Sequence, residues 1–329
     1  MRIRDGFALD AIPGLHAHLV GTDIDNLLKT PESSRRFLFL DEPDRAGPDS
    51  IVILGVGTRL ETLAALAHHG VGLVLAEASL TEIPDPLPLL RIRNARVMLA
   101  ALLHALAGRI ERSVPFAEGT GNAIHHTAIV EGVLEGNVTV EAGAVVEKGS
   151  YVGSGTRLEA NSVVRAHTVI GRDSVVQSGA VIGCAGFGFF ESPSSTGLEH
   201  MPHDAGVRIG ARCFLGANTV VAAGVLHPTK IGDDCKLDSH VQIAHNVRLG
   251  AGALLASQSG IAGSTVIGKY FRMGGAASVA GHLVLGDNVS VAAKAGVTKN
   301  VADGVTVAGF PARPITEWRR DEIKRRTGK

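Results

Sequence analysis

The sequence predicts a mainly β protein whose larger part is a parallel β-helix, with a small α/β domain before it and a short helix after it. Aliphatic residues recur every six positions, a small residue usually follows each four places later, and glycine, aspartate or asparagine stands at the bends. A period of six fits neither a helix nor simple alternation, so the chain must turn a corner after each short strand. The longest series is Ile231, Leu237, Ile243, Leu249, Leu255, Ile261, Ile267, Met273, Val279, Leu285, Val291 and Val297.

Residues 1–110 are expected to form the α/β domain. Residues 51–56 and 71–76 have the composition of buried strands, and residues 61–69 and 96–107 have that of helices. A linker is expected over residues 108–122.

Residues 111–308 are expected to form the β-helix. The six-residue series begins at Leu134, breaks over an inserted loop at 183–208, and is interrupted again over 222–230. Loops of this length between regular coils are commonly functional. Both interruptions precede His245, and we expect them to fold over the face that carries it.

Residues 309–329 leave the repeat and form a C-terminal extension, with a short basic helix at 317–326. Two interpretations of this helix stay open. It caps the open end of the solenoid, or it contacts an acidic carrier protein.

Composition excludes several classes of function. The 329 residues carry no formal net charge, which disfavours nucleic acid as a partner. No stretch approaches the roughly 18 apolar residues of a membrane span, and no signal peptide is evident, so a cytoplasmic protein is expected. The three cysteines form no CxxC pair; Cys213 and Cys235 occupy the small inward position of the repeat and are interpreted as packing residues.

Several motifs together resemble the UDP-3-O-acylglucosamine N-acyltransferase family of lipid A biosynthesis. They are VQIAHNV (241–247), GIAGS (260–264), MGGAASVAGH (273–282), GFGF (186–189) and GFPARPITEW (309–318). The resemblance implies a homotrimer of left-handed β-helices with the active site between neighbouring subunits. It also implies that the N-terminal domain binds the nucleotide-sugar substrate.

The resemblance assigns His245 as the general base and His282 as a second active-site histidine. An imidazole that titrates near neutrality suits proton removal from an attacking amine. Counting repeats places both histidines on one side of a three-sided coil, two coils or roughly 10 Å apart. The expected substrate-binding residues are Phe187, Gly188, Phe189, Asp238, His240, Gln242, Asn246, Gly263 and Gly275.

The implied reaction moves a 3-hydroxyacyl chain from a phosphopantetheine thioester to the amine of a UDP-linked acylated glucosamine. Acyl carrier protein and coenzyme A both present that arm as donor. Backbone amides of 260–263, or of Gly274 and Gly275, are candidate oxyanion donors. No bound cofactor, no metal and no covalent acyl-enzyme are expected.

This chain departs from the family at positions that bear on the acceptor. Ala185 replaces an acidic residue before GFG, and VAAG (221–224) stands where IDRG is common. The family stacks uracil between two aromatic side chains, whereas the rough counterparts here, Ile53 and Arg59, are not aromatic. A paralogue that acylates a different amino sugar or nucleotide sugar is therefore an alternative.

Two alternatives come from other classes. His240 and His245, five residues apart, resemble the ligand spacing of gamma-class carbonic anhydrases, which complete their zinc site with a third histidine from a neighbouring subunit. His203 could supply that histidine, and zinc favours three histidines plus water at catalytic sites. A non-catalytic trimeric scaffold is the second, in which the departures mark a decayed site.

Overall fold

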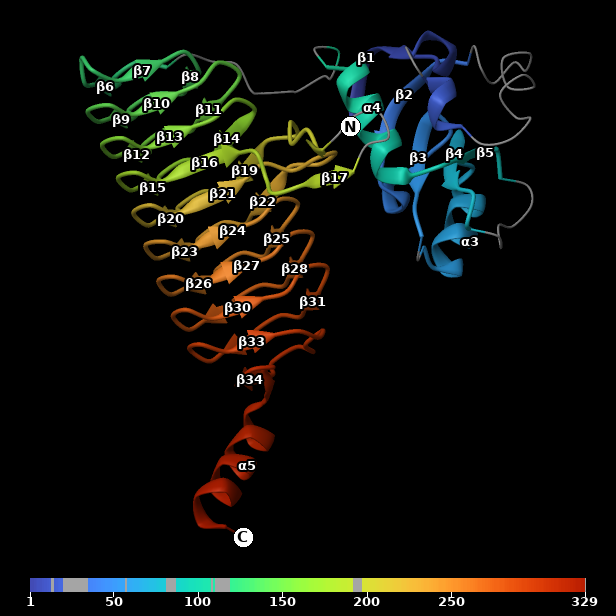
Figure 1. Ribbon diagram of the computed structural model, residues 1–329. Helices are drawn as coiled ribbons and strands as arrows, with labels where there is room; N and C mark the ends of the chain where they lie inside the picture. The colour runs from blue at the N-terminus through green and yellow to red at the C-terminus, as the bar shows by residue number, and fades with distance from the viewer. Residues whose placement is uncertain are drawn as a thin grey trace. The chain divides into compact units, whose positions relative to one another are not determined.

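The computed structural model describes residues 1–12, 15–19, 35–56, 58–80, 87–107, 109, 119–191 and 197–328 (Figure 1). The chain divides into two compact units, each described here by itself. The first comprises Met1–Ser113 with Gly188–Pro202, and the second comprises Val114–Phe187 with His203–Lys329. Most of the predicted linker at 108–122 lies outside the described residues.

The first unit contains a five-stranded sheet in its described part, in which β1 is antiparallel to β2 and the other neighbours are parallel. The two predicted strands correspond to β3 and β4, whose core residues Val52 and Val74 are fully buried. Strands β1 and β5 lack a long apolar run, which is why the sequence pattern missed them, whereas β2 contains the apolar run FLFL, which the prediction did not include. The strands are β1 (Arg2–Phe7), β2 (Phe37–Asp41), β3 (Ser50–Leu54), β4 (Leu73–Glu77) and β5 (Leu89–Ile92).

Both predicted helices of this unit are confirmed. Helix α3 (Leu60–His69) ends at Gly70, whose φ of 62° suits a residue without a β-carbon. Helix α4 (Ala95–Ala105) begins at Asn94, whose side chain accepts hydrogen bonds from the Arg96 and Val97 amides. Short 3₁₀ segments cover Leu9–Ala11, Leu15–His18 and Pro43–Arg45. The antiparallel pair β17 (Phe189–Glu191) and β18 (Leu198–His200), from the predicted insertion, also belongs here.

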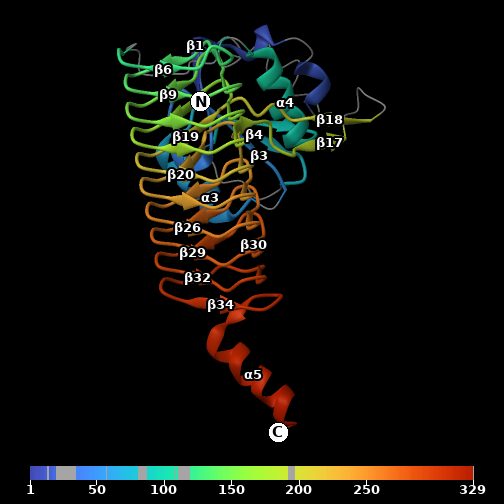
Figure 2. The ribbon, with the colours of Figure 1, turned by 90° about the vertical axis from the view of Figure 1, so that its left-hand side faces the viewer.

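The second unit is the predicted parallel β-helix, and the predicted fold class is confirmed. Its described strands stack into three sheets, which we call the first, second and third faces in the order in which each coil visits them (Figures 1 and 2). Strands one coil apart pair in parallel and in register, as Ile243 does with Ile261. The six-residue period is thus one short strand plus one corner.

The first face has nine strands among the described residues: β7 (Ile129–Val130), β10 (Val145–Val146), β13 (Val163–Val164), β16 (Val181–Cys184), β21 (Val220–Ala222), β24 (Gln242–Ile243), β27 (Gly260–Ile261), β30 (Ser278–Val279) and β33 (Gly296–Val297). The second face has eight in the same described part: β8 (Val133–Leu134), β11 (Tyr151–Val152), β14 (Thr168–Ile170), β19 (Val207–Ile209), β22 (Thr229–Ile231), β25 (Arg248–Leu249), β28 (Val266–Ile267) and β31 (Val284–Leu285).

The third face has eleven strands in the part of the chain that the structure describes: β6 (Ala123–Ile124), β9 (Thr139–Val140), β12 (Arg157–Leu158), β15 (Val175–Val176), β20 (Phe214–Leu215), β23 (Lys236–Leu237), β26 (Leu254–Leu255), β29 (Arg272–Met273), β32 (Ser290–Val291), β34 (Thr306–Ala308) and β35 (Arg313–Pro314). Helix α5 (Ile315–Thr327) follows β35 and contacts β34 and β35. It confirms the predicted C-terminal helix, and none of its residues is buried.

The aliphatic column and the small column fill the interior, as predicted. Ile243 and Leu237 are fully buried, and the small residues Ala253 and Thr265 are equally inaccessible. Each aliphatic side chain removed from water contributes about 1.5–3 kcal/mol. Because one apolar strand residue points inward and its neighbour outward, the outward residues are free to vary with function.

The corners bend through left-handed residues. The second residue of each turn has φ near 60°, and in this chain it is often not glycine: Asn246 has φ 61°, His240 φ 60° and His282 φ 61°. A left-handed residue other than glycine is sterically disfavoured, with asparagine the most tolerant. Each corner therefore holds its side chain in a fixed direction at the edge between two faces.

Candidate active site

The two interruptions of the six-residue series lie at one edge of the β-helix, the corner between the first and second faces, which we call the first corner. The long insertion connects β16 to β19 there, and the shorter irregularity connects β21 to β22. His245 lies in the turn between β24 and β25, and His282 in the turn between β30 and β31. Since β24 pairs with β27 and β27 with β30, the two histidines are two coils apart on one edge, as counted from the sequence.

His245 is oriented by the residue that follows it. Its Nδ1 lies 3.1 Å from Asn246 Oδ1, which also accepts a hydrogen bond from the Val225 amide at 3.3 Å. Asn246 Nδ2 donates to the His227 carbonyl at 3.2 Å, and the Asn246 amide donates to Thr229 Oγ1 at 2.9 Å.

These contacts fix a tautomer. Because Asn246 Nδ2 donates to a carbonyl, Asn246 Oδ1 is the acceptor, and the hydrogen of this contact must sit on His245 Nδ1. The lone pair of the neutral imidazole is then on Nε2. Asn246 therefore performs two tasks, since it fixes the tautomer of His245 and ties the 223–228 segment to the corner.

Two residues of the upstream insertion pack against His245. The ring of His203, which is only 6% exposed, meets the His245 ring edge-on with centroids 4.9 Å apart. A β-carbon on Gly186 would lie 2.8 Å from His203 Nε2 and 2.9 Å from His245 Cβ. The first glycine of GFGF is thus needed for close packing, and the predicted folding of the insertion onto the His245 face is confirmed for these residues.

The next coil brings Gly263 directly against the His245 imidazole. A β-carbon on Gly263 would lie 2.7 Å from His245 Cε1 and 2.8 Å from Nε2. Of the candidate oxyanion donors, the Gly260 amide donates to Ala277 O and the Gly274 amide donates to Val291 O. The Gly263 amide has no acceptor among the described residues. A base nitrogen and an available backbone N–H donor are therefore contributed by adjacent coils.

His282 differs from His245 in its surroundings. It is exposed, and its amide donates to Gly263 O at 3.0 Å. It thus stands one coil beyond Gly263 at the first corner, on the open side of that glycine.

The remaining predicted site residues lie elsewhere. Asp238, His240 and Gly275 are at the corner between the third and first faces, and Gln242 points outward from the first face. Asp238 accepts hydrogen bonds from the Ser239 and Ser257 amides, so its carboxylate braces that corner. The first corner gathers only part of the predicted set: His245, Asn246, Gly263 and His282.

The predicted loop residues are divided between the units. Phe187 belongs to the second unit, and its side chain is 88% exposed. Gly188 and Phe189 belong to the first unit, where the Phe189 ring lies 4.8 Å from that of His200.

The zinc alternative needs His240 beside His245, and within one chain they occupy different corners. Among the described residues, no three or more histidine, cysteine or acidic side chains gather closely enough to hold a metal ion. His203, by contrast, contacts His245 within the same chain.

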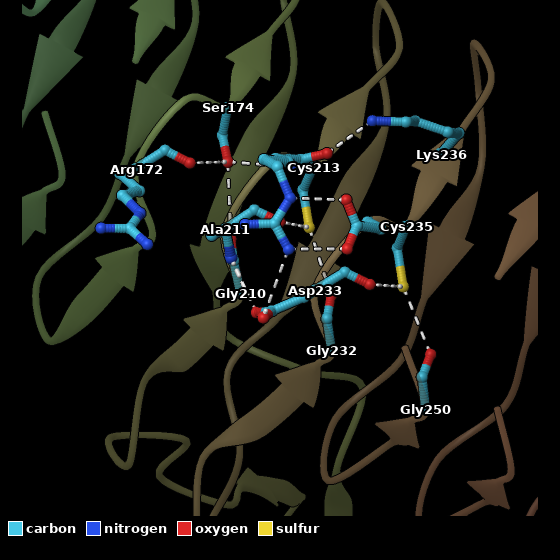
Figure 3. Close-up of polar contacts among 12 residues, drawn as sticks. Arg172, Ser174, Gly210, Ala211, Cys213, Gly232, Asp233, Cys235, Lys236 and Gly250 are labelled. Atoms are coloured by element: carbon cyan, nitrogen blue, oxygen red, sulfur yellow. Dashed lines mark hydrogen bonds and ion pairs between the residues drawn. The ribbon is translucent and has the colours of Figure 1, made fainter. Parts of the chain in front are cut away.

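The cysteines pack as predicted. Cys213 and Cys235 are buried, and their thiols donate to the Gly232 and Gly250 carbonyls at 3.2 and 3.3 Å (Figure 3). The hydrogen bond with Cys235, together with burial, raises the pKa of the Cys213 thiol, and burial raises that of Cys184. A raised thiol pKa lowers the thiolate fraction of Cys213 and Cys184 and hence their nucleophilicity.

The residues at the first corner that differ from the family motif are small and apolar. Ala222 and Ala223 are buried, and the Ala223 amide donates to Cys184 O. They line the first corner one coil before His245 and place no charged group there.

The sequence repeats match known family patterns. The pattern described as bacterial transferase hexapeptide (six repeats) matches residues 149–184 and 228–263, and that of the hexapeptide repeat of succinyl-transferase matches residues 206–239. Over these residues the coils are similar to transferase hexapeptide repeats. The second hexapeptide match includes both His245 and Gly263.

Curated proteins that are similar to this chain carry acyltransferase names. The chain is 50% identical over 144 residues to UDP-3-O-acylglucosamine N-acyltransferase of Caulobacter vibrioides, over 44% of this chain and 42% of that protein. It is 38% identical over 147 residues to probable UDP-3-O-acylglucosamine N-acyltransferase 2, mitochondrial, of Arabidopsis thaliana, over 45% and 48% respectively. The chain thus spans less than half the length of these relatives, and the resemblance read from the motifs is confirmed over that part.

Solved hexapeptide-repeat structures share the fold. LpxA from Acinetobacter baumannii aligns with a TM-score of 0.52 at 23% identity, over 60% of this chain and 77% of that one. UDP-N-acetylglucosamine acyltransferase from Francisella novicida aligns with a TM-score of 0.50 at 19% identity, over 59% and 67%. None of the helices in the described ranges combines the length and apolar character needed to cross a bilayer.

Proposed function

We propose that this protein is an N-acyltransferase that moves a 3-hydroxyacyl chain from a phosphopantetheine thioester to the amine of a UDP-linked acylated glucosamine. One observation carries the proposal. His245, with its lone pair held on Nε2 by Asn246, lies against Gly263, whose amide is available as a donor. Amide formation from a thioester needs both a base and an oxyanion donor.

In the proposed reaction, the amine nitrogen attacks the thioester carbonyl carbon and forms the new C–N bond. His245 Nε2 accepts the proton that the nitrogen loses, while the Gly263 N–H donates to the developing oxyanion. When the tetrahedral intermediate collapses, the C–S bond breaks and the imidazolium returns its proton to the leaving thiolate. Amide and free thiol are the products, and no acyl-enzyme forms.

His282 is proposed to contact the sugar of the acceptor, since it lies on the open side of Gly263. By the relatives' names and the motifs, we further propose a cytoplasmic homotrimer in a lipid A pathway, with acyl carrier protein as donor. Asp238, His240 and Gly275 lie at the corner between the third and first faces. In such a trimer they would bind substrate only in the active site of a neighbouring subunit.

The acceptor is the least constrained part of the proposal. Ala222 and Ala223 remove charged groups from the wall of the first corner, and Ile53 and Arg59 offer no aromatic stack. A paralogue with another amine-bearing sugar is the alternative that these positions support.

The test is an acyl-transfer assay with 3-hydroxyacyl carrier protein and UDP-3-O-acylglucosamine. Loss of the general base in His245→Ala should lower the rate by about 10²- to 10⁴-fold. The matched variants are His282→Asn and His240→Asn, because asparagine tolerates the left-handed backbone of those corners.

The outcomes separate the candidate functions. Loss of turnover with His245→Ala and His282→Asn, with at most a raised KM in His240→Asn, supports the proposal. Stoichiometric zinc with loss of CO₂ hydration in His240→Asn would replace it with the carbonic anhydrase reading. A well-folded protein that transfers acyl groups to no amino sugar would be a scaffold.

A further inference from the structure

Three basic side chains form a column on the second face. In chain order the column ends at Arg248, on the coil of His245. Arg208 pairs with Lys230, and Lys230 pairs with Arg248, on three adjacent parallel strands. They occupy the outward position of β19, β22 and β25. We call this set the cation column.

The column is confined to these coils. In register with it, the outward position holds Val169 on the strand before and Val266 and Val284 on the strands after. The equivalent outward positions of the first face are uncharged throughout the described strands: Ile129, Val145, Val163, Val181, Val220, Gln242, Gly260, Ser278 and Gly296. The three charges therefore do not follow from the repeat itself.

Like charges directly opposite one another on neighbouring strands are destabilising. Here they are about 4.8 Å apart by strand spacing, so the column spans roughly 10 Å. An anion that lies across the column would offset this repulsion.

The surroundings suit a small anion. The three side chains line a groove of about 440 Å³, whose floor includes Gly210 and Gly232. These glycines contribute no side chain to the groove, and both are visible in Figure 3 beside Asp233. Asp233, the acidic residue lining the groove, caps the Ala211 amide and lies near Arg212.

Arg208 is the most enclosed member of the column. Its Nη1 donates to the His167 and Val207 carbonyls at 2.7 and 3.0 Å, and burial lowers the pKa of the guanidinium. These bonds hold the guanidinium in place, and its remaining N–H groups can donate to a ligand. Planar guanidinium groups bind phosphate oxygens in pairs.

We propose that the cation column binds the diphosphate of a nucleotide-sugar acceptor. A diphosphate carries several anionic oxygens in one compact group, which matches three cations better than a single phosphomonoester does. Arg248 follows His245 by three residues, so their α-carbons are at most about 10 Å apart. The sugar attached to the diphosphate then extends toward the first corner. This placement rests on the proposed function, while the phosphate-binding groove itself does not.

The experiment measures direct binding by calorimetry of UDP, inorganic pyrophosphate, uridine and 4′-phosphopantetheine. The test variant is Lys230→Gln with Arg248→Gln. Its matched control is Lys236→Gln with Arg272→Gln, which removes the same two charges from outward strand positions of the third face. UDP carries no amine to acylate, so its binding is measured in the absence of the reaction. A lack of UDP binding in the groove is therefore a separate result from a lack of acyl transfer.

We expect the test variant to lose at least about tenfold in affinity for UDP and pyrophosphate. The control should retain wild-type affinity, uridine binding should not change, and each single variant should lose less than the pair. Thermal melts of all variants check that they are folded. An equal loss in the control, no loss in the test variant, or no pyrophosphate binding by the wild type would overturn the proposal. A loss confined to 4′-phosphopantetheine would overturn the assignment to the nucleotide.

Discussion

Gly263→Ala should impair His245 by displacing its imidazole, although the residue itself is unchanged. The added methyl would lie 2.7 Å from His245 Cε1, whereas ordinary carbon contacts are about 3.5–4.0 Å. The imidazole must therefore move by roughly 0.8 Å or more, the difference between those distances. A displacement of about 1 Å in a catalytic group costs on the order of 10²-fold in rate. We expect a loss of that size in acyl transfer.

The matched control is Gly260→Ala, three residues earlier on the same coil, where an added β-carbon meets nothing within 4 Å. Both variants are compared by acyl-transfer kinetics and thermal melting. If displacement of the imidazole is the cause, Gly263→Ala adds little in a protein that already carries His245→Ala, because both changes remove one interaction.

The opposite result is equally clear. Wild-type turnover in a folded Gly263→Ala protein would refute the placement of the base and oxyanion donor on adjacent coils. A full additional loss in the double variant would show that Gly263 acts independently of His245.

Three further predictions follow from particular contacts. Asn246→Gly keeps a residue that tolerates the left-handed corner and removes the acceptor for His245 Nδ1–H, so it should lower acyl transfer by at least about tenfold with the fold intact; full activity would show that tautomer control is unnecessary. Burial raises the pKa of Tyr151 to about 12, so its contribution to the free energy of unfolding is complete below the ordinary value of about 10 and is lost as pH rises through 12. Urea unfolding of wild type and Tyr151→Phe over that range should therefore show a steeper alkaline loss in the wild type, and parallel curves would contradict it. Cys213→Ala with Cys235→Ala should leave acyl transfer intact, and mass spectrometry should find no acyl adduct during turnover; a stable adduct would exclude direct transfer.

Much of the second unit was predictable because its physics is local. A strand of two ordered residues followed by a fixed corner repeats every six positions, so Ile243 and Leu249 reveal their burial by spacing alone. The same counting put His245 and His282 on one edge, two coils apart. In the first unit, the apolar strands β3 and β4 were predicted, and β2 has a comparable apolar run that was not used, whereas β1 and β5 have no such run.

The parts that were missed depend on contacts without sequence periodicity. His203 is 42 positions before His245 in an irregular segment; the sequence linked the two only as candidate zinc ligands, and their ring contact could not be predicted from the spacing. Gly186 looked like one member of a GFGF motif, and only its distance to both histidines shows why it is glycine. Asn246 was expected to bind substrate, and only the structure shows that it also contacts His245 and the 223–228 segment through hydrogen bonds.

The sequence alone determined the period, the inward residues and the edge on which the histidines stand, because each follows from geometry repeated every six residues. Tertiary structure decided which nitrogen of His245 carries its proton, which backbone amide remains available beside it, and which cations align on the second face. Those properties depend on side chains meeting across coils, and a repeat specifies the stacking of its backbone but not the chemistry of the residues that it leaves free.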